Sequence, residues 1–359
     1  MASASIVITT HDYERFLPYA VDSALAQTHG RLEVVVVDDG STDGTPAVLE
    51  RYAGRIVALR KQNGGQASAF NAGLAASTGD LVCFLDADDL LLPHAIARAV
   101  AEYERAPYAK AHWPLWEIDA GRRALGSIDP PAPLAAGDLR ARIARRGPGA
   151  YVTPPTSGNL FARHVLEAIG PVPDDLRLTA DSYLYDQAPL YGRVADLGAP
   201  LGAIRRHGRR HFSSLAFEER LANSVLAHEL LLAPLARRCA ELGLEHDVAA
   251  WRDRSWPMRS RRALDEVAEV VQRDTVWALA DGGRLGVPTA HGEALAFPAD
   301  PPDTVALDAL ERLRAAGARF LVVAWPSFGW LERVPRFAAR LRRRHRLVRA
   351  TERVRVFAL

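Results

Sequence analysis

The sequence predicts an α/β protein with a mainly parallel, mixed sheet, followed by a helical segment and a smaller α/β domain. Strand and helix patterns alternate over the first 110 residues, which is typical of βαβ units. The strand pattern at 32–37 is too continuously apolar for a sheet with one solvated face. A long helical pattern follows residue 214, and a second alternation of strands and helices begins near residue 275. Ligands of such sheets bind beyond the carboxyl ends of the strands.

Each element of the first 110 residues has its own signal. Runs of Val, Ile and Leu predict the strands, and apolar residues at helical spacing predict the helices. A turn rich in Ser, Thr and Asp leads into the second helix, and two glycines precede the third. The expected strands are 5–10, 32–37, 55–60 and 80–85, and the expected helices are 16–27, 42–52, 66–76 and 90–100.

The rest of the chain is less regular at first and then mostly helical. Prolines mark a loop between residues 111 and 150. The expected domains are 1–214, with halves 1–110 and 111–214, a helical linker at 215–274, and a small domain at 275–359. The expected helices are 161–169, 215–244, 249–272, 305–316 and 335–344, and the expected strands are 275–280, 320–324 and 353–358.

Composition excludes several classes of protein. The chain has 359 residues, of which 25% are charged, and a formal net charge of +2. Its two cysteines, Cys83 and Cys239, are too few for a disulfide framework or a Cys-rich zinc site. Neither an apolar run of about 18 residues nor a leader pattern occurs, so we expect a soluble, cytoplasmic protein.

Charge is unevenly distributed along the chain. Residues 1–200 carry 18 basic and 24 acidic side chains, and the remainder carries 27 and 19. Of the 45 basic residues only Lys61 and Lys110 are lysines. A GC-rich genome explains the arginine excess, and so does a basic surface for anionic partners. The basic run at 340–346 is either a solvated face or a surface for membrane lipid or an anionic acceptor.

The densest acidic cluster follows the expected strand 80–85. Asp86, Asp88 and Asp89 lie within four residues and repel one another, so a divalent cation is a natural partner for them. The Asp-x-Asp spacing in an extended segment places Asp86 and Asp88 on one side. The alternative is that Asp88 or Asp89 caps the helix expected at 90–100, which would explain one carboxylate and not three.

A second cluster follows the valines of the strand 32–37. Asp39 lies at that strand end, where its carboxylate could accept hydrogen bonds from a nucleobase N–H or a ribose hydroxyl. Asp43 is better explained by a turn into the next helix. Gly64 and Gly65 precede another helix and allow a ligand to approach the backbone, although the loop lacks the Gly-Lys-Ser/Thr ending of a Walker loop.

Five motifs follow one another along the first hundred residues: SIVITTHDY (5–13), DSALAQT (22–28), VVDDGSTD (36–43), NGGQASAFNAG (63–73) and FLDADD (84–89). Together they resemble the nucleotide-sugar half of the family-2 glycosyltransferases, inverting enzymes of the GT-A fold. The resemblance covers about residues 4–100 and continues more weakly to about residue 212. It implies metal-dependent transfer of a sugar from a nucleoside diphosphate, expected to be UDP, to a hydroxyl acceptor.

The resemblance also implies roles for single residues in the donor site. Thr9 and Asp39 match positions that hold the nucleobase and ribose, and Gln66 and Asp86 belong to the same nucleotide-sugar site. His11 stands where the family usually has a tyrosine that stacks on uracil, and an imidazole ring can stack as well. These five residues are the expected contacts of the donor.

A metal site is implied next to these contacts. Asp88 completes the Asp-x-Asp motif, which binds Mn²⁺ or Mg²⁺ in the family. The segment around His207 resembles one that closes the donor site, where a histidine can complete the metal sphere. His211 is the competing candidate, and a purely structural hydrogen bond is the alternative for either histidine.

An inverting transfer needs a general base that takes the proton of the acceptor hydroxyl. Asp181 matches the position of this base in the family, with Ala180 in place of the usual glutamate. The alternative is that Asp181 is the N-cap of the helix that follows it. Asp186 is the second candidate for the base.

The acceptor side and the C-terminal part are less defined. Trp113 and Trp116 either form a sugar-stacking wall or pack in the core, and Asn159 is a further acceptor-side candidate. Residues 317–331 resemble a small α/β module appended to bacterial glycosyltransferases.

We expect as partners a nucleotide-sugar donor and a hydroxyl acceptor, which is a glycan, a lipid-linked molecule or a small molecule, but no nucleic acid. Peripheral membrane contact and a homodimer stay open. Two rival interpretations are a non-catalytic nucleotide-sugar-binding scaffold and a sugar-phosphate nucleotidyltransferase. Residues 9–15 lack the basic, glycine-rich loop of the latter class.

Overall fold

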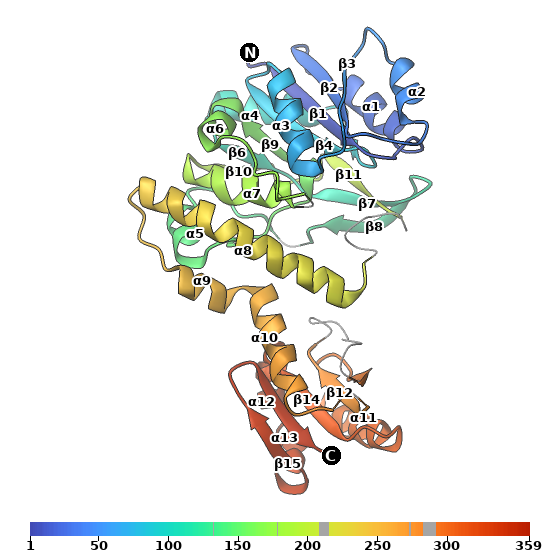
Figure 1. Ribbon diagram of the computed structural model, residues 1–359, viewed down its shortest axis with the longest axis vertical. Helices are drawn as coiled ribbons and strands as arrows, with labels where there is room; N and C mark the ends of the chain where they lie inside the picture. The colour runs from blue at the N-terminus through green and yellow to red at the C-terminus, as the bar shows by residue number, and fades with distance from the viewer. Residues whose placement is uncertain (132, 178, 208–214, 273, 283–291) are drawn as a thin grey trace. The chain divides into compact units, whose positions relative to one another are not determined.

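The structure, a computed structural model, describes residues 1–131, 133–177, 179–207, 215–272, 274–282 and 292–359 (Figure 1). Its contacts divide into two compact units. The first spans Met1–Arg210 and Glu229–Trp251, and the second spans His211–His228 and Arg252–Leu359, each taken over its described residues. The long helix α8 (Phe217–Glu241) therefore contributes residues to both units.

The first unit is built on a seven-stranded mixed sheet in the order β10-β6-β9-β4-β1-β2-β3. The strands β1 to β4 run parallel to one another, whereas β9 runs antiparallel between β4 and β6. The bounds are β1 Ala4–Thr10, β2 Leu32–Asp38, β3 Val57–Arg60, β4 Leu81–Asp86, β6 Lys110–His112, β9 Asn159–Ala162 and β10 Val194–Asp196.

The register of the parallel strands gathers polar residues at one edge of this sheet. Thr10 of β1 pairs with Asp38 of β2, and Thr9 pairs with Asp86 of β4. The interior of β2 is buried on both faces, which explains its unbroken run of valines. The carboxyl ends of β1, β2 and β4 therefore meet at the edge where such sheets bind ligands.

Helices cover both faces of the sheet. The contacts join α1 (Leu17–Leu25) to α2 (Thr45–Glu50), and they join α3 (Gln66–Ala76) to β1, β2 and α7 (Ala180–Gln187). In Figure 1, α3 lies in front of the strands. A Cβ atom on Gly73 of α3 would come within 2.2 Å of Val7, so this glycine allows the helix to pack closely on the sheet.

A second sheet of the first unit brings a late segment next to the end of β4. Its order is β5-β11-β7-β8, and β5 directly follows the acidic turn after β4. Its strands are β5 Leu90–Leu91, β7 Leu115–Asp119, β8 Ala124–Asp129 and β11 Gly202–Arg206. The unit also contains α4 Ala95–Arg105, α5 Arg140–Arg146, η1 Thr156–Gly158, α6 Arg163–Ile169, η2 Ala188–Leu190 and α9 Val248–Arg254, the last of which extends past the unit's boundary.

The second unit is a smaller α/β structure around a five-stranded sheet in the order β13-β12-β14-β16-β15. Its core includes Leu321, Phe337 and Leu341, all fully buried. The elements are α10 Trp256–Ala268, β12 Val276–Ala280, β13 Glu293–Ala296, α11 Asp303–Ala315, β14 Phe320–Ala324, η3 Trp325–Ser327, α12 Phe328–Arg333, α13 Pro335–Arg344, β15 Arg346–Ala350 and β16 Val354–Ala358.

Some sequence expectations are confirmed and others are wrong. The helices expected at 66–76 and 335–344 occur with those bounds. The start of the helix expected at 90–100 is wrong, because Leu90 and Leu91 form β5 and the helix, α4, begins only after Pro93, at Ala95. The single helix expected at 249–272 is two helices, because Pro257 lies in the first turn of α10.

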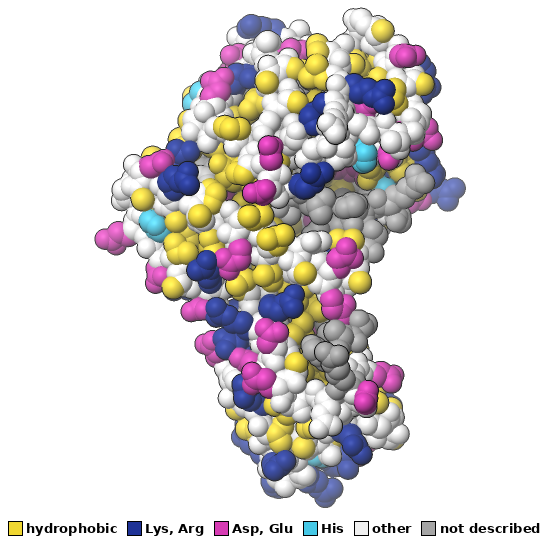
Figure 2. Space-filling view, viewed as in Figure 1, with side chains coloured by type: hydrophobic (Ala, Val, Ile, Leu, Met, Phe, Trp, Pro, Cys, Tyr) yellow, Lys and Arg dark blue, Asp and Glu magenta, His cyan; other side chains and the backbone are white. Residues whose placement is uncertain are grey.

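The basic run at 340–346 lies on α13 and the start of β15. Arg342, Arg343 and Arg344 are exposed, whereas Phe337 and Leu341 turn into the core. Figure 2 shows Lys and Arg side chains gathered over the end of the second unit where these elements lie. Over the ranges that the structure describes, none of the helices combines the length and apolarity that crossing a bilayer requires.

Candidate active site

Asp39, directly after β2, organises the loop that precedes α3. Its Oδ1 accepts hydrogen bonds from Lys61 Nζ at 2.7 Å and from the Gly64 amide at 3.0 Å. Its Oδ2 accepts from the Gly65 amide at 2.7 Å. The side chain is 6% exposed, so these charge-assisted bonds lie out of bulk water. The carboxylate expected to bind the donor thus also fixes the glycine loop.

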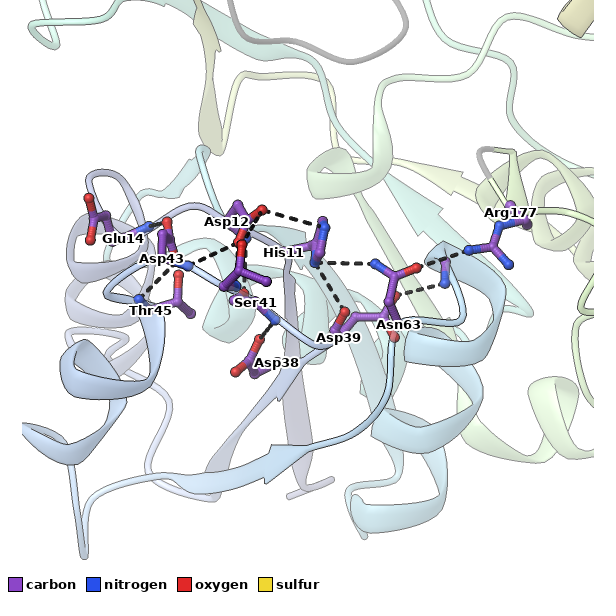
Figure 3. A network of polar contacts seen from close by, with 12 residues as sticks. His11, Asp12, Glu14, Asp38, Asp39, Ser41, Asp43, Thr45, Asn63 and Arg177 are labelled. Atoms are coloured by element: carbon purple, nitrogen blue, oxygen red, sulfur yellow. Dashed lines mark hydrogen bonds and ion pairs between the residues drawn. The ribbon is translucent and has the colours of Figure 1, made fainter.

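The expected stacking residue, His11, lies beside this loop (Figure 3). Its Nδ1 lies 3.1 Å from the Asp39 carbonyl oxygen and 3.2 Å from Asn63 Nδ2. Arg177, which sequence analysis did not single out, donates from Nη2 to Asn63 Oδ1 at 2.9 Å. The His11 side chain is 45% exposed, so the ring is accessible at the edge of the site.

Two glycines of this region are required by the backbone. Gly40 has φ +78°, and a Cβ atom there would lie 2.7 Å from the Asn63 amide nitrogen. Gly65 has φ +84° and faces Arg177, to whose Cβ an added Cβ would approach within 3.0 Å. Any larger side chain would be strained at both positions, so the two loops can meet only through glycine.

The turn from β2 to α2 is held by carboxylates. Asp43 accepts from the Thr45 amide at 2.9 Å and from the Glu14 amide at 3.0 Å, which confirms the turn role expected for it. Asp12 accepts from the Thr42 amide at 2.7 Å, and this bond holds the pKa of Asp12 below its usual value. Figure 3 shows these contacts beside His11.

The acidic cluster after β4 divides into different roles. Asp89 is fully buried and accepts from Ser157 Oγ at 2.7 Å and from the Arg205 amide at 3.0 Å. It ties β11 and η1 to the turn. Because α4 begins at Ala95, with His94 as its N-cap, the alternative that Asp88 or Asp89 caps this helix is wrong.

Asp88 meets the expected histidine. His207 Nε2 lies 2.8 Å from Asp88 Oδ2, and the His207 side chain is only 4% exposed. The imidazole also lies 4.6 Å from the ring centre of Phe16. Imidazole nitrogen and carboxylate oxygen are ligand types that Mn²⁺ accepts, so this pair fits part of a metal site. His211 lies outside the described residues.

No group of three or more His, Cys, Asp or Glu side chains within the described ranges is arranged to hold a metal ion. A metal at Asp88 and His207 would therefore take its further ligands from other groups. The buried Arg205, whose Nε donates to the Asp88 carbonyl oxygen at 2.8 Å, fixes the backbone of this turn. Its guanidinium lies 5.0 Å from the ring centre of Phe16.

Asp181 lies in the first turn of α7, one residue inside the helix, and Thr179 is the N-cap. The alternative that Asp181 is only the N-cap of this helix is therefore wrong. Its Oδ2 accepts from Thr156 Oγ1 at 3.2 Å and from Tyr185 Oη at 3.3 Å, and its Oδ1 accepts from the Ser182 amide at 2.7 Å. Burial raises the pKa of this carboxyl, and these three donors oppose the rise.

Gln66 joins the donor loop to the helix that carries Asp181. Its side-chain Oε1 accepts a hydrogen bond from the Ala180 backbone amide at 3.0 Å. The backbone amide of Gln66 donates to the Arg177 carbonyl at 2.9 Å. The first residues of α3 and α7 are therefore bonded to each other. Gln66 was expected to contact the donor, but in the structure its side-chain oxygen bonds the first residue of α7.

The acceptor-side candidates lie in different environments. Trp113 is fully buried in the core of the first unit, which favours the packing alternative, whereas Trp116 is 43% exposed. Asn159 is fully buried, and its amide donates to the Pro155 carbonyl at 2.8 Å and to Tyr185 Oη at 3.2 Å. Asn159 therefore supports the turn near Asp181.

The second candidate for the base, Asp186, is buried on the other side of α7. It is 3% exposed and accepts from the Gly149 amide at 3.0 Å. Burial raises its pKa to about 7.

Sequence analysis did not single out Lys61, Thr156 or Tyr185, which bond Asp39 or Asp181, or Lys110, which lies against the ring of Tyr185. The scarcity of lysine was a usable signal, because one of the two lysines bonds Asp39 and the other is buried below Tyr185.

The fold and this site together define a glycosyltransferase of the GT-A type. The sequence pattern of "Glycosyl transferase family 2" matches residues 5–168. An uncharacterized glycosyltransferase of Nostoc sp. is 36% identical over 217 residues, which are 59% of this chain and 67% of that protein. The chain belongs to glycosyl transferase family 2, as its motifs predicted.

Other relatives match shorter segments. The chondroitin synthase of Pasteurella multocida is 39% identical over 102 residues, which are 28% of this chain and 11% of that protein. An uncharacterized glycosyltransferase of Rickettsia typhi is 38% identical over 96 residues, so the chain spans only 30% of that relative. A crystal structure of S. aureus TarS 1–349 in complex with UDP-GlcNAc covers 73% of this chain and 83% of its own, with 17% identity and a TM-score of 0.49.

Proposed function

We propose that the protein is a metal-dependent inverting glycosyltransferase that moves a sugar from a nucleoside diphosphate, UDP in the first instance, to a hydroxyl acceptor. Asp181 is the general base. The observation that carries the proposal is the bond from the Ala180 amide to Gln66 Oε1. It holds the helix of the base against the loop that Asp39 organises, so donor and base belong to one site.

The donor lies at the carboxyl ends of β1, β2 and β4. Thr9, His11 and Asp39 lie at or just beyond the ends of β1 and β2, and Asp86 ends β4 beside Thr9. His11 offers an accessible ring for stacking on the nucleobase. Asp39 already accepts three hydrogen bonds, and a carboxylate has room for about one more, from a base N–H or a ribose hydroxyl.

Asp88 and His207 would hold the divalent metal, Mn²⁺ or Mg²⁺. Asp86, beside them, would contact the nucleotide-sugar donor. The bound metal would offset the negative charge that builds on the leaving diphosphate. The two side chains already share a hydrogen bond, and Arg205 and Asp89 fix the turn that carries Asp88.

Asp181 takes the proton of the acceptor hydroxyl while that oxygen attacks the anomeric carbon from the face opposite the diphosphate. Its raised pKa makes the carboxylate a stronger base, and the Thr156 and Tyr185 hydroxyls orient it. Direct displacement inverts the anomeric centre, so an α-linked donor gives a β-linked product. A glycan or a lipid-linked sugar fits the acceptor role.

Thermal stability tests the donor and metal assignments without knowledge of the acceptor. We expect UDP with Mn²⁺ to stabilise the protein by about 2.7 kcal/mol at a concentration 100-fold above its Kd, and much less in EDTA. Asp88→Asn should lose the metal-dependent part. Stabilisation by no nucleotide, or equal stabilisation in EDTA, would contradict the proposal.

A further inference from the structure

Lys110, in the short strand β6 between β10 and β9, is fully buried. Its Nζ lies 3.3 Å from His112 Nδ1 and 3.3 Å from Tyr151 Oη. The same atom lies 5.2 Å from the ring centre of Tyr151 and 4.8 Å from that of Tyr185. A lysine enclosed by two aromatic rings in a protein with 43 arginines is an unusual choice of cation.

Both hydrogen-bond partners of Lys110 act as acceptors. His112 Nε2 lies 2.9 Å from the Ala135 carbonyl and donates its proton there, which leaves Nδ1 of a neutral ring as an acceptor. Burial and the neighbouring cation lower the pKa of His112 to about 3, in keeping with a neutral ring. Tyr151 Oη donates to the Tyr185 carbonyl at 2.7 Å, so its lone pair faces Lys110. Both partners therefore accept hydrogen bonds from the ammonium form of Lys110.

The charge of Lys110 reaches Asp181 through one ring. Lys110 Nζ lies against the face of Tyr185, and Tyr185 Oη donates to Asp181 Oδ2 at 3.3 Å. A cation on the face of a phenol withdraws charge from the ring and makes its hydroxyl a stronger donor. Asn159 Nδ2 donates to the same hydroxyl oxygen at 3.2 Å, which orients its proton towards Asp181.

We propose that Lys110 is a positioning residue that acts through Tyr185 to favour the ionised form of Asp181, and so keeps the base available in weakly acidic solution. This inference rests on the proposed role of Asp181 as the base.

The other groups around Asp181 do not replace this charge. Thr156 and Ser182 are neutral donors, and Asp86 at the end of β4 raises the pKa of the Tyr185 hydroxyl electrostatically. Burial raises the pKa of Asp186 on α7 to about 7, so this carboxyl carries its proton in weakly acidic solution. Burial lowers the pKa of Lys110 only to about 7, so the lysine is charged in that range.

The test is a pH titration of Asp181 in the full-length protein. Infrared difference spectroscopy of the carboxyl C=O band measures its protonation. Asp181→Asn assigns the band. We expect Lys110→Met to raise the midpoint by about one pH unit, the order of effect that losing a nearby unit charge has at an effective dielectric constant of ~20. Tyr185→Phe, which keeps the ring and removes the relaying hydroxyl, should also raise it.

Asp186→Asn is the matched control inside the same cluster. It mimics the protonated carboxyl, so the Asp181 midpoint should stay within about 0.3 pH unit. Arg51→Met, which removes an exposed cation elsewhere in the unit, should leave it unchanged. An unchanged midpoint in both Lys110→Met and Tyr185→Phe would overturn the inference, as would an equal rise in Asp186→Asn.

The kinetic readout separates this inference from the proposed function. The probes are UDP-glucose, UDP-galactose and UDP-GlcNAc with Mn²⁺, and water accepts the sugar. The pH profile of kcat/KM for UDP release should show an acid limb that moves with the infrared midpoint. If Asp181→Asn releases UDP as fast as the unsubstituted protein, the assignment of Asp181 as the base fails. If Asp181→Asn is inactive but the limb does not move in Lys110→Met, only the role of Lys110 fails.

Discussion

Replacing Asp39 by asparagine should destabilise the first unit and open the loop before α3. The substitution removes the charge that faces Lys61, and it presents an NH₂ group to one of the two glycine amides. A charge-assisted hydrogen bond contributes about 1.5–3 kcal/mol, and an unsatisfied buried amide costs about 1–3 kcal/mol.

Exposure reduces the first of these contributions. The Lys61 side chain is 26% exposed, so water compensates part of its loss and leaves about 1 kcal/mol. Adding the unpaired amide gives a total of about 2–4 kcal/mol, a large fraction of the 5–15 kcal/mol that stabilises an ordinary domain.

Urea unfolding followed by tryptophan fluorescence measures this effect. At an m-value of about 2 kcal/mol/M, the midpoint of the transition that reports the first unit should fall by about 1–2 M. Asp138→Asn is the matched control, because Asp138 also pairs with a cation, Arg140, but its side chain is 55% exposed. That variant should lose less than about 1 kcal/mol. Equal losses in the two variants would refute the view that Asp39 fixes the loop.

Three further outcomes follow from the same site. Asp181→Asn should retain UDP affinity but lower kcat by about 10²–10⁴-fold, and wild-type turnover would place the base elsewhere. His207→Ala should raise the Mn²⁺ concentration needed for half-maximal activity by about tenfold or more, and an unaltered requirement would remove His207 from the metal site. The raised pKa of Asp186 means that the native state keeps a proton that the unfolded chain has released, so stability should fall as pH rises from about 4 to about 7, by at most about 1.4 kcal/mol per pH unit. Urea midpoints across that range should decline less in Asp186→Asn, and parallel declines would contradict the assignment.

The sequence predicted what local pattern determines. The strands β1, β2 and β4 carry continuous apolar runs, and α3 and α13 have sharp boundaries set by glycine and proline, so their positions were predictable. The strands β13 and β15 were not expected, because most of their side chains are polar, small or exposed, and tertiary pairing rather than propensity makes them strands.

The family resemblance implied that Asp88 lies with His207, or with its competitor His211, at a metal site. The structure brings Asp88 and His207 together although they are 119 positions apart in the sequence, and their role in metal binding stays a prediction. The enclosure of Lys110 was not predictable, because it depends on which residues of α7 and of the segment at 147–155 turn towards β6. Tyr151 and Tyr185 look like ordinary core residues in the sequence, and only the packing shows that both enclose an amine.

The two lysines also make the chain a convenient target for amine chemistry. An acylating reagent at alkaline pH finds two lysine amines in this sequence, those of Lys61 and Lys110. Lys110 is enclosed and Lys61 is one-quarter accessible, with its nitrogen bonded to Asp39 and to the Gln62 carbonyl. The rate at which Lys61 is modified therefore reports how often the loop before α3 opens, and a fluorophore attached to Lys61 would probe that loop.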